Sequence, residues 1–421
     1  MAGLHWRVCS TAEAMTACPP ALHRFFRSAS SFSSVAQKET SNRVSGSSGA
    51  QSPPIHFAGQ RNSRALSTAP GGYMSTGRWG NKNATRYLIT GACGQVGQEL
   101  LPYMRARFGS RNVIASDVRS APRHMLDGGP FNYLDVTQYD QLARVVLEHG
   151  VDAIVHLAAM LPAAGEKSPQ LALQVNNAGT ANVLELARLN SLRVFCPSSI
   201  AVFGPSTPKQ LAPDETAMRP STAYGISKVH MELLGEYYHR KFGVDFRSLR
   251  YPGVISSEAM PGGGATDYAV EMFRHAAHIH STNSTNKTDS THNTASTAGT
   301  YPYRCFLRAD ATLPMMYMPD LLRATVSLLE APSRSLSRRT YNVAALSVSP
   351  SELAAVIKRE VPTFDAVYEP DFRQQIAESW PQHVDDSIAR RDWNWTHEFG
   401  LEDMAQDMLA RLRDSSQQRR R

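Results

Sequence analysis

Two side chains with complementary chemistry lie four residues apart in segment 223–228, which reads Ala-Tyr-Gly-Ile-Ser-Lys. Positions i and i+4 are neighbours on one face of a helix, so Tyr224 and Lys228 would lie side by side. The ammonium would favour the ionised phenol and lower its pKa, which is about 10 for a free tyrosine. Such a phenol removes a proton from a substrate hydroxyl near neutral pH. Tyr-x-x-x-Lys also occurs by chance on solvated helices, so the prediction depends on what positions the pair.

A nucleotide-binding turn precedes this pair. The apolar stretch 86–90 predicts a strand, and residues 98–107 predict a helix. Between them lie three glycines in Gly-x-x-Gly-x-x-Gly spacing, at positions 91, 94 and 97. Glycines in this context let the backbone approach a pyrophosphate, which is bound at the helix N-terminus.

An acidic residue follows at the end of the next predicted strand, 112–116. The Asp117 carboxylate would accept hydrogen bonds from an adenosine ribose and repel a 2′-phosphate. The sequence therefore favours NAD over NADP, although Arg119 lies close enough to weaken that preference.

Strands and helices continue to alternate towards the tyrosine. Further strands are predicted over 131–136, 153–159 and 193–199, with helices over 139–149 and 170–190. This alternation predicts an α/β fold of the Rossmann type, a doubly wound parallel sheet. Ligands bind outside the carboxyl ends of such strands. Ser199 falls at one of these ends, where its hydroxyl could orient the reacting oxygen towards Tyr224.

The motifs resemble the extended short-chain dehydrogenase/reductase superfamily. They are T-G-A-C-G-Q-V-G at 90–97, H-L-A-A at 156–159, S-S-I-A-V-F-G at 198–204, Y-G-I-S-K at 224–228 and R-Y-P-G at 250–253. The resemblance implies that Ser199, Tyr224 and Lys228 are catalytic and that Asn176 supports the proton relay. The residues predicted to contact NAD are Gly91, Gly94, Gln95, Val96, Gly97, Asp117, Asp135, Val136, Leu157, Ala158, Ala159, Tyr224, Lys228, Tyr251 and Val254.

Further stretches look like the short-chain type of L-threonine 3-dehydrogenases. They are residues 261–269, 315–320, 379–395 and the Ala-Gly-Glu-Lys loop at 164–167. This resemblance implies NAD-dependent oxidation of L-threonine at its β-hydroxyl to 2-amino-3-oxobutyrate. It also implies a homodimer built through the helices that start near Gln170 and Tyr224. The residues predicted to contact substrate are Ser199, Tyr224, Gly264 and Thr266, although Ala265 stands where that family has threonine.

Two alternative functions remain open. One is a sugar-nucleotide epimerase, in which NAD stays bound and is regenerated. The other is a non-catalytic NAD-binding protein, which the complete Ser, Tyr and Lys set disfavours. In nucleotide-sugar dehydratases an acidic residue follows the strand-end serine or threonine. Ile200 and Ala201 follow Ser199 here, so the sequence does not predict dehydration.

The N-terminal 84 residues have a composition of their own. They contain nine Lys or Arg residues and only two acids, Glu13 and Glu39, and they are rich in Ser and Ala. This composition predicts a mitochondrial transit peptide and a matrix location, the alternatives being another organelle or a tail without an address. Beyond residue 84, 35 basic and 35 acidic residues cancel. A neutral folded part argues against a nucleic-acid partner.

The sequence predicts neither a metal site nor a membrane span. The five cysteines are scattered without a C-x-x-C pair, which fits a reducing compartment. No apolar stretch approaches the roughly 20 residues that cross a bilayer.

The predicted domains follow from these features. They are a targeting or disordered leader over 1–84, an NAD-binding Rossmann domain over 85–252, and a substrate lobe over 253–413 that interleaves with returning Rossmann elements. A polar insertion at about 280–300 is predicted to be disordered, and 414–421 to be a basic tail.

Overall fold

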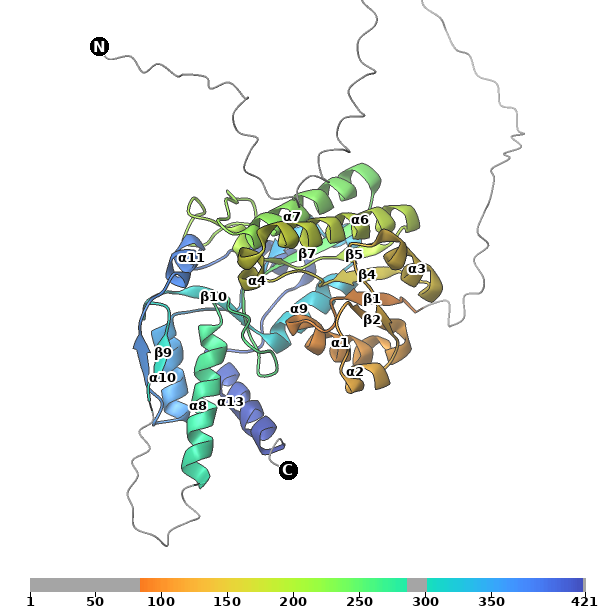
Figure 1. Cartoon of the computed structure of the whole chain (residues 1–421). Helices are drawn as coiled ribbons and strands as arrows, with labels where there is room; N and C mark the ends of the chain where they lie inside the picture. The colour runs from red at the N-terminus through yellow and green to blue at the C-terminus, as the bar shows by residue number, and fades with distance from the viewer. Residues whose placement is uncertain (1–83, 286–300, 419–421) are drawn as a thin grey trace, which may run out of the picture. The chain divides into compact units, whose positions relative to one another are not determined.

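The computed structural model describes residues 84–285 and 301–418 (Figure 1). Predictions for residues 1–83, 286–300 and 419–421 lie outside the described residues, so they stay predictions. None of the helices that the structure describes is long and apolar enough to cross a membrane.

Eight strands of the described chain form one parallel sheet, which confirms the predicted doubly wound fold. Its order is β11-β7-β5-β4-β1-β2-β3, with β6 paired to β7. The strand bounds are β1 Tyr87–Thr90, β2 Val113–Asp117, β3 Phe131–Tyr133, β4 Ala153–His156, β5 Arg193–Phe195, β6 Ser198–Ser199, β7 Asp245–Tyr251 and β11 Thr340–Asn342. The chain reverses its direction of winding between β1 and β4, so their carboxyl ends border the crevice where ligands of such sheets bind.

Helices cover both faces of this sheet (Figure 1). One face packs against α3 (Tyr139–His149), α6 (Gly179–Asn190) and α7 (Ala223–Phe242), and the other against α1 (Gln95–Phe108) and α9 (Met318–Glu330). Shorter helical segments are η2 Ser110–Asn112, α2 Arg123–Asp127, α4 Pro162–Lys167, α5 Pro169–Leu173, η4 Ile200–Val202, η5 Ser333–Ser335 and α12 Ser387–Trp393. The helix predicted over 170–190 is interrupted by the π-helical turn η3 (Gln174–Ala178), which carries Asn176.

A smaller lobe follows β7 along the chain. It contains a three-stranded sheet of β8 (Gly253–Ile255), β10 (Leu313–Tyr317) and β12 (Leu346–Val348), and a pair of β9 (Tyr303–Cys305) with β13 (Ala366–Tyr368). Its helices are α8 Tyr268–Thr285, α10 Pro350–Glu360, α11 Arg373–Ser379 and α13 Leu401–Gln418. An apolar core of its own holds these elements together, with Tyr268, Phe273 and Phe364 fully buried.

Two predicted boundaries of this lobe are wrong. Helix α8 continues to Thr285, so residues 280–285 of the insertion are helical. Helix α13 continues to Gln418, so most of the segment predicted as a tail is helical. Single-sequence patterns fail at such helix ends because the last turns carry no apolar periodicity. The predicted domain boundaries at 84 and 252 stay predictions.

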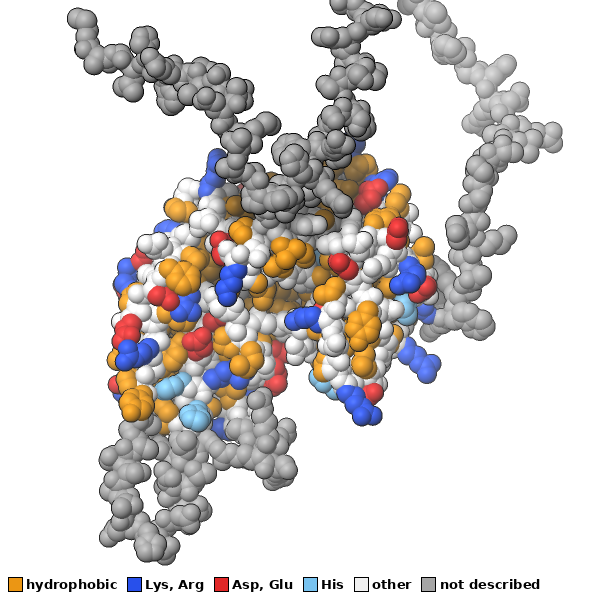
Figure 2. Space-filling view, in the orientation of Figure 1, with side chains coloured by type: hydrophobic (Ala, Val, Ile, Leu, Met, Phe, Trp, Pro, Cys, Tyr) orange, Lys and Arg blue, Asp and Glu red, His pale blue; other side chains and the backbone are white. Residues whose placement is uncertain are grey.

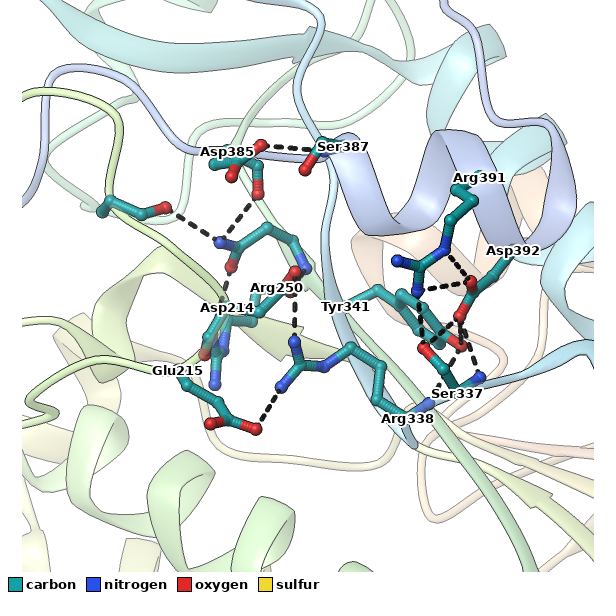
Figure 3. A network of polar contacts seen from close by, with 12 residues as sticks. Asp214, Glu215, Arg250, Ser337, Arg338, Tyr341, Asp385, Ser387, Arg391 and Asp392 are labelled. Atoms are coloured by element: carbon teal, nitrogen blue, oxygen red, sulfur yellow. Dashed lines mark hydrogen bonds and ion pairs between the residues drawn. The ribbon is translucent and has the colours of Figure 1, made fainter.

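A buried ion pair joins the end of the main sheet to α7. The Arg250 guanidinium on β7 donates to Glu232 on α7 at 2.7 and 3.0 Å, and the two side chains are 5% and 2% exposed. The Ser198 hydroxyl donates to the same carboxylate. Arg250 also donates to the Asp214 carbonyl at 2.7 Å and to Asn342 on β11 at 3.1 Å (Figure 3). One network therefore fixes β6, β7, β11 and α7 relative to one another.

We predict that Glu232→Gln lowers the free energy of unfolding by about 3–5 kcal/mol, because it leaves the Arg250 charge buried without its counter-charge. Chemical denaturation measures the change. The matched control is Glu369→Gln, which breaks an ion pair with Arg304 whose side chains are 56% and 75% exposed. That change should cost less than about 1 kcal/mol. Equal losses in the two variants would contradict a structural role for the buried pair.

Candidate active site

One large cavity brings the predicted site residues together. It has a volume of about 990 Å³ and lies between the carboxyl ends of β1, β4 and β6, the loop after β8, and α11. Hydrophobic side chains gather in the middle of the face shown in Figure 2. Every residue predicted to contact NAD or substrate lines this cavity. Asn176, predicted to support the proton relay, does not.

The glycine turn forms a cradle that side chains would fill. Gly91 has φ +72°, and a Cβ there would lie 2.6 Å from the Ala158 nitrogen. A Cβ on Gly97 would lie 2.5 Å from the Ala92 carbonyl oxygen. Gly94, which precedes α1, supplies no side-chain cap to the first N–H groups of that helix. The glycines leave the backbone uncovered by side chains, and the first N–H groups of α1 have no side-chain cap. Both features suit a pyrophosphate, so these residues fit a dinucleotide.

Asp117 is held firmly at the end of β2. Its carboxylate accepts hydrogen bonds from the N–H groups of Cys93 and Arg119, both at 2.9 Å, and only 4% of its side chain is exposed. The Arg119 guanidinium lies on the same carboxylate at 3.2 Å. The basic residue that weakened the cofactor prediction is therefore paired with the acid itself.

Tyr224 and Lys228 lie in the first turns of α7, close to Ser199. Thr222 caps this helix by accepting the Gly225 N–H at 3.0 Å. The Lys228 ammonium lies 5.4 Å from the centre of the Tyr224 ring and donates to the Pro197 carbonyl at 2.7 Å. Ser199 hydrogen-bonds the phenol. The helix and the end of β6 thus bring a phenol, an ammonium and a hydroxyl to one wall of the cavity.

Burial controls the proton affinities of this group. It raises the pKa of Tyr224 to about 12, and the hydrogen bond with Ser199 opposes the rise only in part. Burial also lowers the pKa of Lys228 to about 8. The predicted lowering of the phenol pKa by Lys228 is therefore wrong for the chain alone. Removal of the phenol from water dominates its pKa, and the Lys228 ammonium donates its hydrogen bond to the Pro197 carbonyl rather than to the phenol.

Asn176 contacts the helix that carries Tyr224 and Lys228. Its amide donates to the Ser227 hydroxyl at 3.0 Å and accepts the Met160 N–H at 2.8 Å. Together with Lys228 and His156 it lines a second, small cavity. The π-helical turn places this amide here, and no local pattern predicted that turn.

The glycine-rich loop after β8 covers the cavity. The N–H groups of Gly262, Gly263 and Gly264 all donate to one oxygen of Asp267, Oδ2, at 2.7, 2.6 and 2.9 Å. Thr266 packs against β8, because a Cβ on Gly253 would lie 2.6 Å from its Cγ2. The sequence of this loop does not identify Asp267 as a site residue, because its partners are backbone N–H groups.

The sequence did not predict two further features of the cavity, which are a hydrogen bond of Gln95 and three lining residues in and beside α11. The Gln95 side chain, predicted to contact the cofactor, donates to the Met260 carbonyl of the glycine-rich loop. Phe372, Arg373 and Trp380, in and beside α11, also line the cavity. Of these only Trp380 lay in a stretch that the sequence singled out, and the other two come from a part of the chain without a motif.

No cluster of three or more His, Cys, Asp or Glu side chains is arranged to hold a metal within residues 84–285 and 301–418. The three cysteines in this part, Cys93, Cys196 and Cys305, are buried free thiols.

Comparisons with known proteins agree with this site. The model of the NAD dependent epimerase/dehydratase family matches residues 87–344. The mitochondrial L-threonine 3-dehydrogenase of Bos taurus is 45% identical over 325 residues, which are 77% of this chain and 82% of the bovine protein. Crystal structures of L-threonine dehydrogenases from Phytophthora infestans and Clostridium difficile are 55% and 40% identical, with TM-scores of 0.71 and 0.72. Both cover 79% of this chain, and the matches span 100% and 98% of those chains.

The chain therefore belongs to the NAD-dependent epimerase/dehydratase family, a part of the extended short-chain dehydrogenases/reductases. Among its members it is similar to the L-threonine 3-dehydrogenases.

The buried lysine predicts how stability depends on pH. Folded Lys228 loses its proton near pH 8, below its ordinary value of 10.5, so between these limits unfolding takes up a proton. The contribution of Lys228 to stability should therefore rise with pH from 8 to 10.5, by at most about 1.4 kcal/mol per pH unit, and stay flat below pH 8.

Denaturation of the wild type and of Lys228→Met at several pH values tests this. The difference in free energy of unfolding should move in favour of the wild type as the pH rises from 8 to 10.5. A difference that shrinks over this interval would contradict the burial of an uncharged lysine.

Proposed function

We propose that this protein is an NAD-dependent L-threonine 3-dehydrogenase, which oxidises the β-hydroxyl of L-threonine and forms 2-amino-3-oxobutyrate. The observation that carries the proposal is the grouping of Ser199, Tyr224 and Lys228 on one wall of a cavity whose other end is a dinucleotide cradle. The identity of 40–55% with proteins named L-threonine dehydrogenases supports the choice of substrate.

Each residue has a distinct task in this proposal. Ser199 donates a hydrogen bond to the substrate hydroxyl and holds it beside the phenol. Tyr224, as the phenolate, takes the proton of the substrate hydroxyl while the hydroxyl oxygen becomes a carbonyl oxygen. In the complex with NAD and substrate, the Lys228 ammonium would stabilise the phenolate. Asn176 holds Ser227 and the loop before α4 in place through its hydrogen bonds with Ser227 and Met160. When bound, NAD supplies the acceptor for the hydride that leaves Cβ.

The glycine-rich loop closes the substrate end. Gly264 and Thr266 line the cavity there, and Gln95 joins the loop to the dinucleotide turn through Met260. A covered site excludes water from a hydride transfer. Tyr251 and Val254 form the neighbouring wall, which suits the nicotinamide ring.

Formation of NADH from NAD, followed at 340 nm, tests this function. L-Threonine should give turnover, whereas D-threonine and UDP-galactose should not. Interconversion of UDP-sugars without a reaction of L-threonine would favour the epimerase instead, because an epimerase regenerates its bound NAD.

Tyr224→Phe should lower kcat by roughly 10²- to 10⁴-fold, the range for loss of a general base. NAD binding, measured by fluorescence titration, should persist because the glycine cradle is untouched. Tyr103→Phe, an exposed tyrosine on α1, is the matched control and should keep full activity. Turnover of Tyr224→Phe within a few-fold of the wild type would rule out the phenol as the base.

NAD should be preferred over NADP, because the Asp117 carboxylate would face the added phosphate. Asp117→Asn removes the charge, keeps an acceptor for the Cys93 N–H and releases Arg119 from its ion pair. The variant should raise kcat/KM for NADP by at least tenfold, about 1.4 kcal/mol. Combining it with Arg119→Ala should remove most of that gain. An unchanged ratio of the two cofactors would refute the role of Asp117.

We propose a homodimer built through α5, α6 and α7. Ile226, Leu233 and Tyr237 are each about half exposed and lie seven and four residues apart, so they share one face of α7. Leu171 on α5 and Leu189 on α6 are exposed apolar residues as well. Leu233→Glu should convert the dimer to a monomer in light scattering, whereas Leu147→Glu, an exposed leucine on α3, should not. A wild-type protein that is monomeric would end this proposal.

We further propose that residues 1–84 direct the protein to the mitochondrial matrix. The proposal is supported by the composition of the leader and by the name of the bovine relative, which includes the word mitochondrial. A fluorescent protein carrying residues 1–84 should enter mitochondria, and a cytosolic location of the fusion would contradict the proposal.

A further inference from the structure

The proposed substrate carries an ammonium group and a carboxylate next to the reacting carbon. The residues assigned above account for the hydroxyl, but none of them balances the ammonium charge. Among the described residues, the carboxylates that line the cavity are Asp117, Asp135, Glu166 and Asp267. The following inference rests on the proposed function, since it concerns the recognition of an amino acid.

The two carboxylates at the dinucleotide end are already engaged. Asp117 pairs with Arg119 and accepts two backbone N–H groups. Asp135 accepts the N–H and the hydroxyl of Thr137 at 2.9 and 2.8 Å. Asp117 ends β2 and Asp135 follows β3, and these two strands border the adenosine half of a dinucleotide in this fold. Neither of them is placed to meet a substrate beside Tyr224.

Asp267 combines a fixed carboxylate with an open oxygen. Its Oδ2 accepts three backbone N–H groups from the glycine-rich loop, at 2.6–2.9 Å. Its Oδ1 accepts no hydrogen bond from any residue that the structure describes, and no Lys or Arg of that part forms an ion pair with Asp267. The side chain is half-buried in the cavity wall. Three donors on one oxygen hold the other in a single orientation without cancelling the charge.

The position of Asp267 is right for a group near the reacting carbon. Its neighbour Thr266 touches Gly253 on β8, and β8 directly follows Tyr251 and Pro252, which line the nicotinamide wall. The ammonium nitrogen of threonine is only two bonds from the carbon that loses hydride. A cation-binding group for this substrate must therefore lie in the loop that covers the catalytic wall, where Asp267 lies.

Glu166 is the other carboxylate with an open oxygen. Its Oε1 accepts the Ala223 N–H at 2.8 Å, just before Tyr224, and it has no other hydrogen bond within the described residues. The side chain is exposed, however, and one hydrogen bond leaves a long side chain free to rotate. An exposed carboxylate binds a cation weakly because water screens the charge. Asp267 is both less exposed and better fixed.

We propose that Asp267 is a specificity residue, whose Oδ1 accepts a hydrogen bond from the substrate α-ammonium and so selects amino acids over hydroxy acids that lack the amino group. The three glycine N–H groups orient the carboxylate before the substrate arrives, so binding costs little conformational entropy. A hydroxy acid would leave Oδ1 desolvated without a partner when the loop covers the site, which is the kind of mismatch that gives strong discrimination.

The role of Asp267 is tested by comparing the wild type and one variant on two substrates that differ only in the amino group. Asp267→Asn keeps an oxygen for the three glycine N–H groups but removes the charge and presents an amide to the cavity. The two substrates are L-threonine and (R)-3-hydroxybutyrate, which has the same configuration at the hydroxyl carbon and no amino group. kcat/KM is measured for both with the wild type and the variant, and NAD binding and thermal stability show that the fold is kept.

Asp267→Asn should lower kcat/KM for L-threonine by roughly 10- to 100-fold, the range for loss of one charged hydrogen bond. The value for (R)-3-hydroxybutyrate should change by less than about threefold, well inside the factor of 10 that corresponds to 1.4 kcal/mol. An equal loss for both substrates would show that Asp267 only holds the loop and would overturn the proposal.

Glu166→Gln is the matched control and should change kcat/KM for both substrates by the same factor. A loss confined to L-threonine in this variant, and not in Asp267→Asn, would transfer the role to Glu166. If Asp267→Asn fails to fold, Asp267→Ser takes its place in the same comparison of the two substrates. The preference of the wild type for L-threonine over (R)-3-hydroxybutyrate is then a second, independent test. A wild type that oxidises both acids equally would also overturn the proposal, whereas a wild type inactive on L-threonine would instead end the proposed function.

Discussion

The buried pair of Glu232 and Arg250 is the constraint on which the geometry of the site depends. Lys228 lies one helical turn before Glu232, and Ser199 follows Ser198, whose hydroxyl donates to the same carboxylate. Arg250 precedes Tyr251 in the wall of the cavity. The phenol, the ammonium and the serine hydroxyl thus come from elements that a single charged network holds in place. Two charges in the protein interior are tolerated only because each is fully hydrogen-bonded.

Much of this arrangement was predictable from the sequence, because it depends on local signals. Glycines at 91, 94 and 97 fix the turn before α1, and alternating apolar strands and helices dictate a parallel sheet. The carboxyl ends of parallel strands meet at one edge, which is why Asp117, Ala158 and Ser199 line the same cavity. The spacing of Tyr224 and Lys228 predicts their proximity on a helix, and they lie as expected.

Other features depend on contacts between distant segments, which no local pattern encodes. The π-helical turn at Gln174–Ala178 brings Asn176 to Ser227, 51 residues further along the chain. The three glycine N–H groups on Asp267 follow from the path of a loop rather than from any residue type. Proton affinity is similar, because the raised pKa of Tyr224 reflects how completely the fold excludes water, and a sequence motif carries no measure of burial.

The edge strand β11 of the main sheet comes from a part of the chain that follows β8, α8, β9 and β10 of the smaller lobe. Arg250 on β7 hydrogen-bonds Asn342 on β11, and the two residues are 92 positions apart. A ribosome adds about 5 to 20 residues per second, so some 5 to 18 s separate the synthesis of these partners. During that interval β7 has no β11 to pair with, and Arg250 lacks its hydrogen bond to Asn342. The last neighbour of β7 therefore joins the main sheet only after Thr340–Asn342 have been made, and until then the unpaired strand edge is a place where another strand could pair.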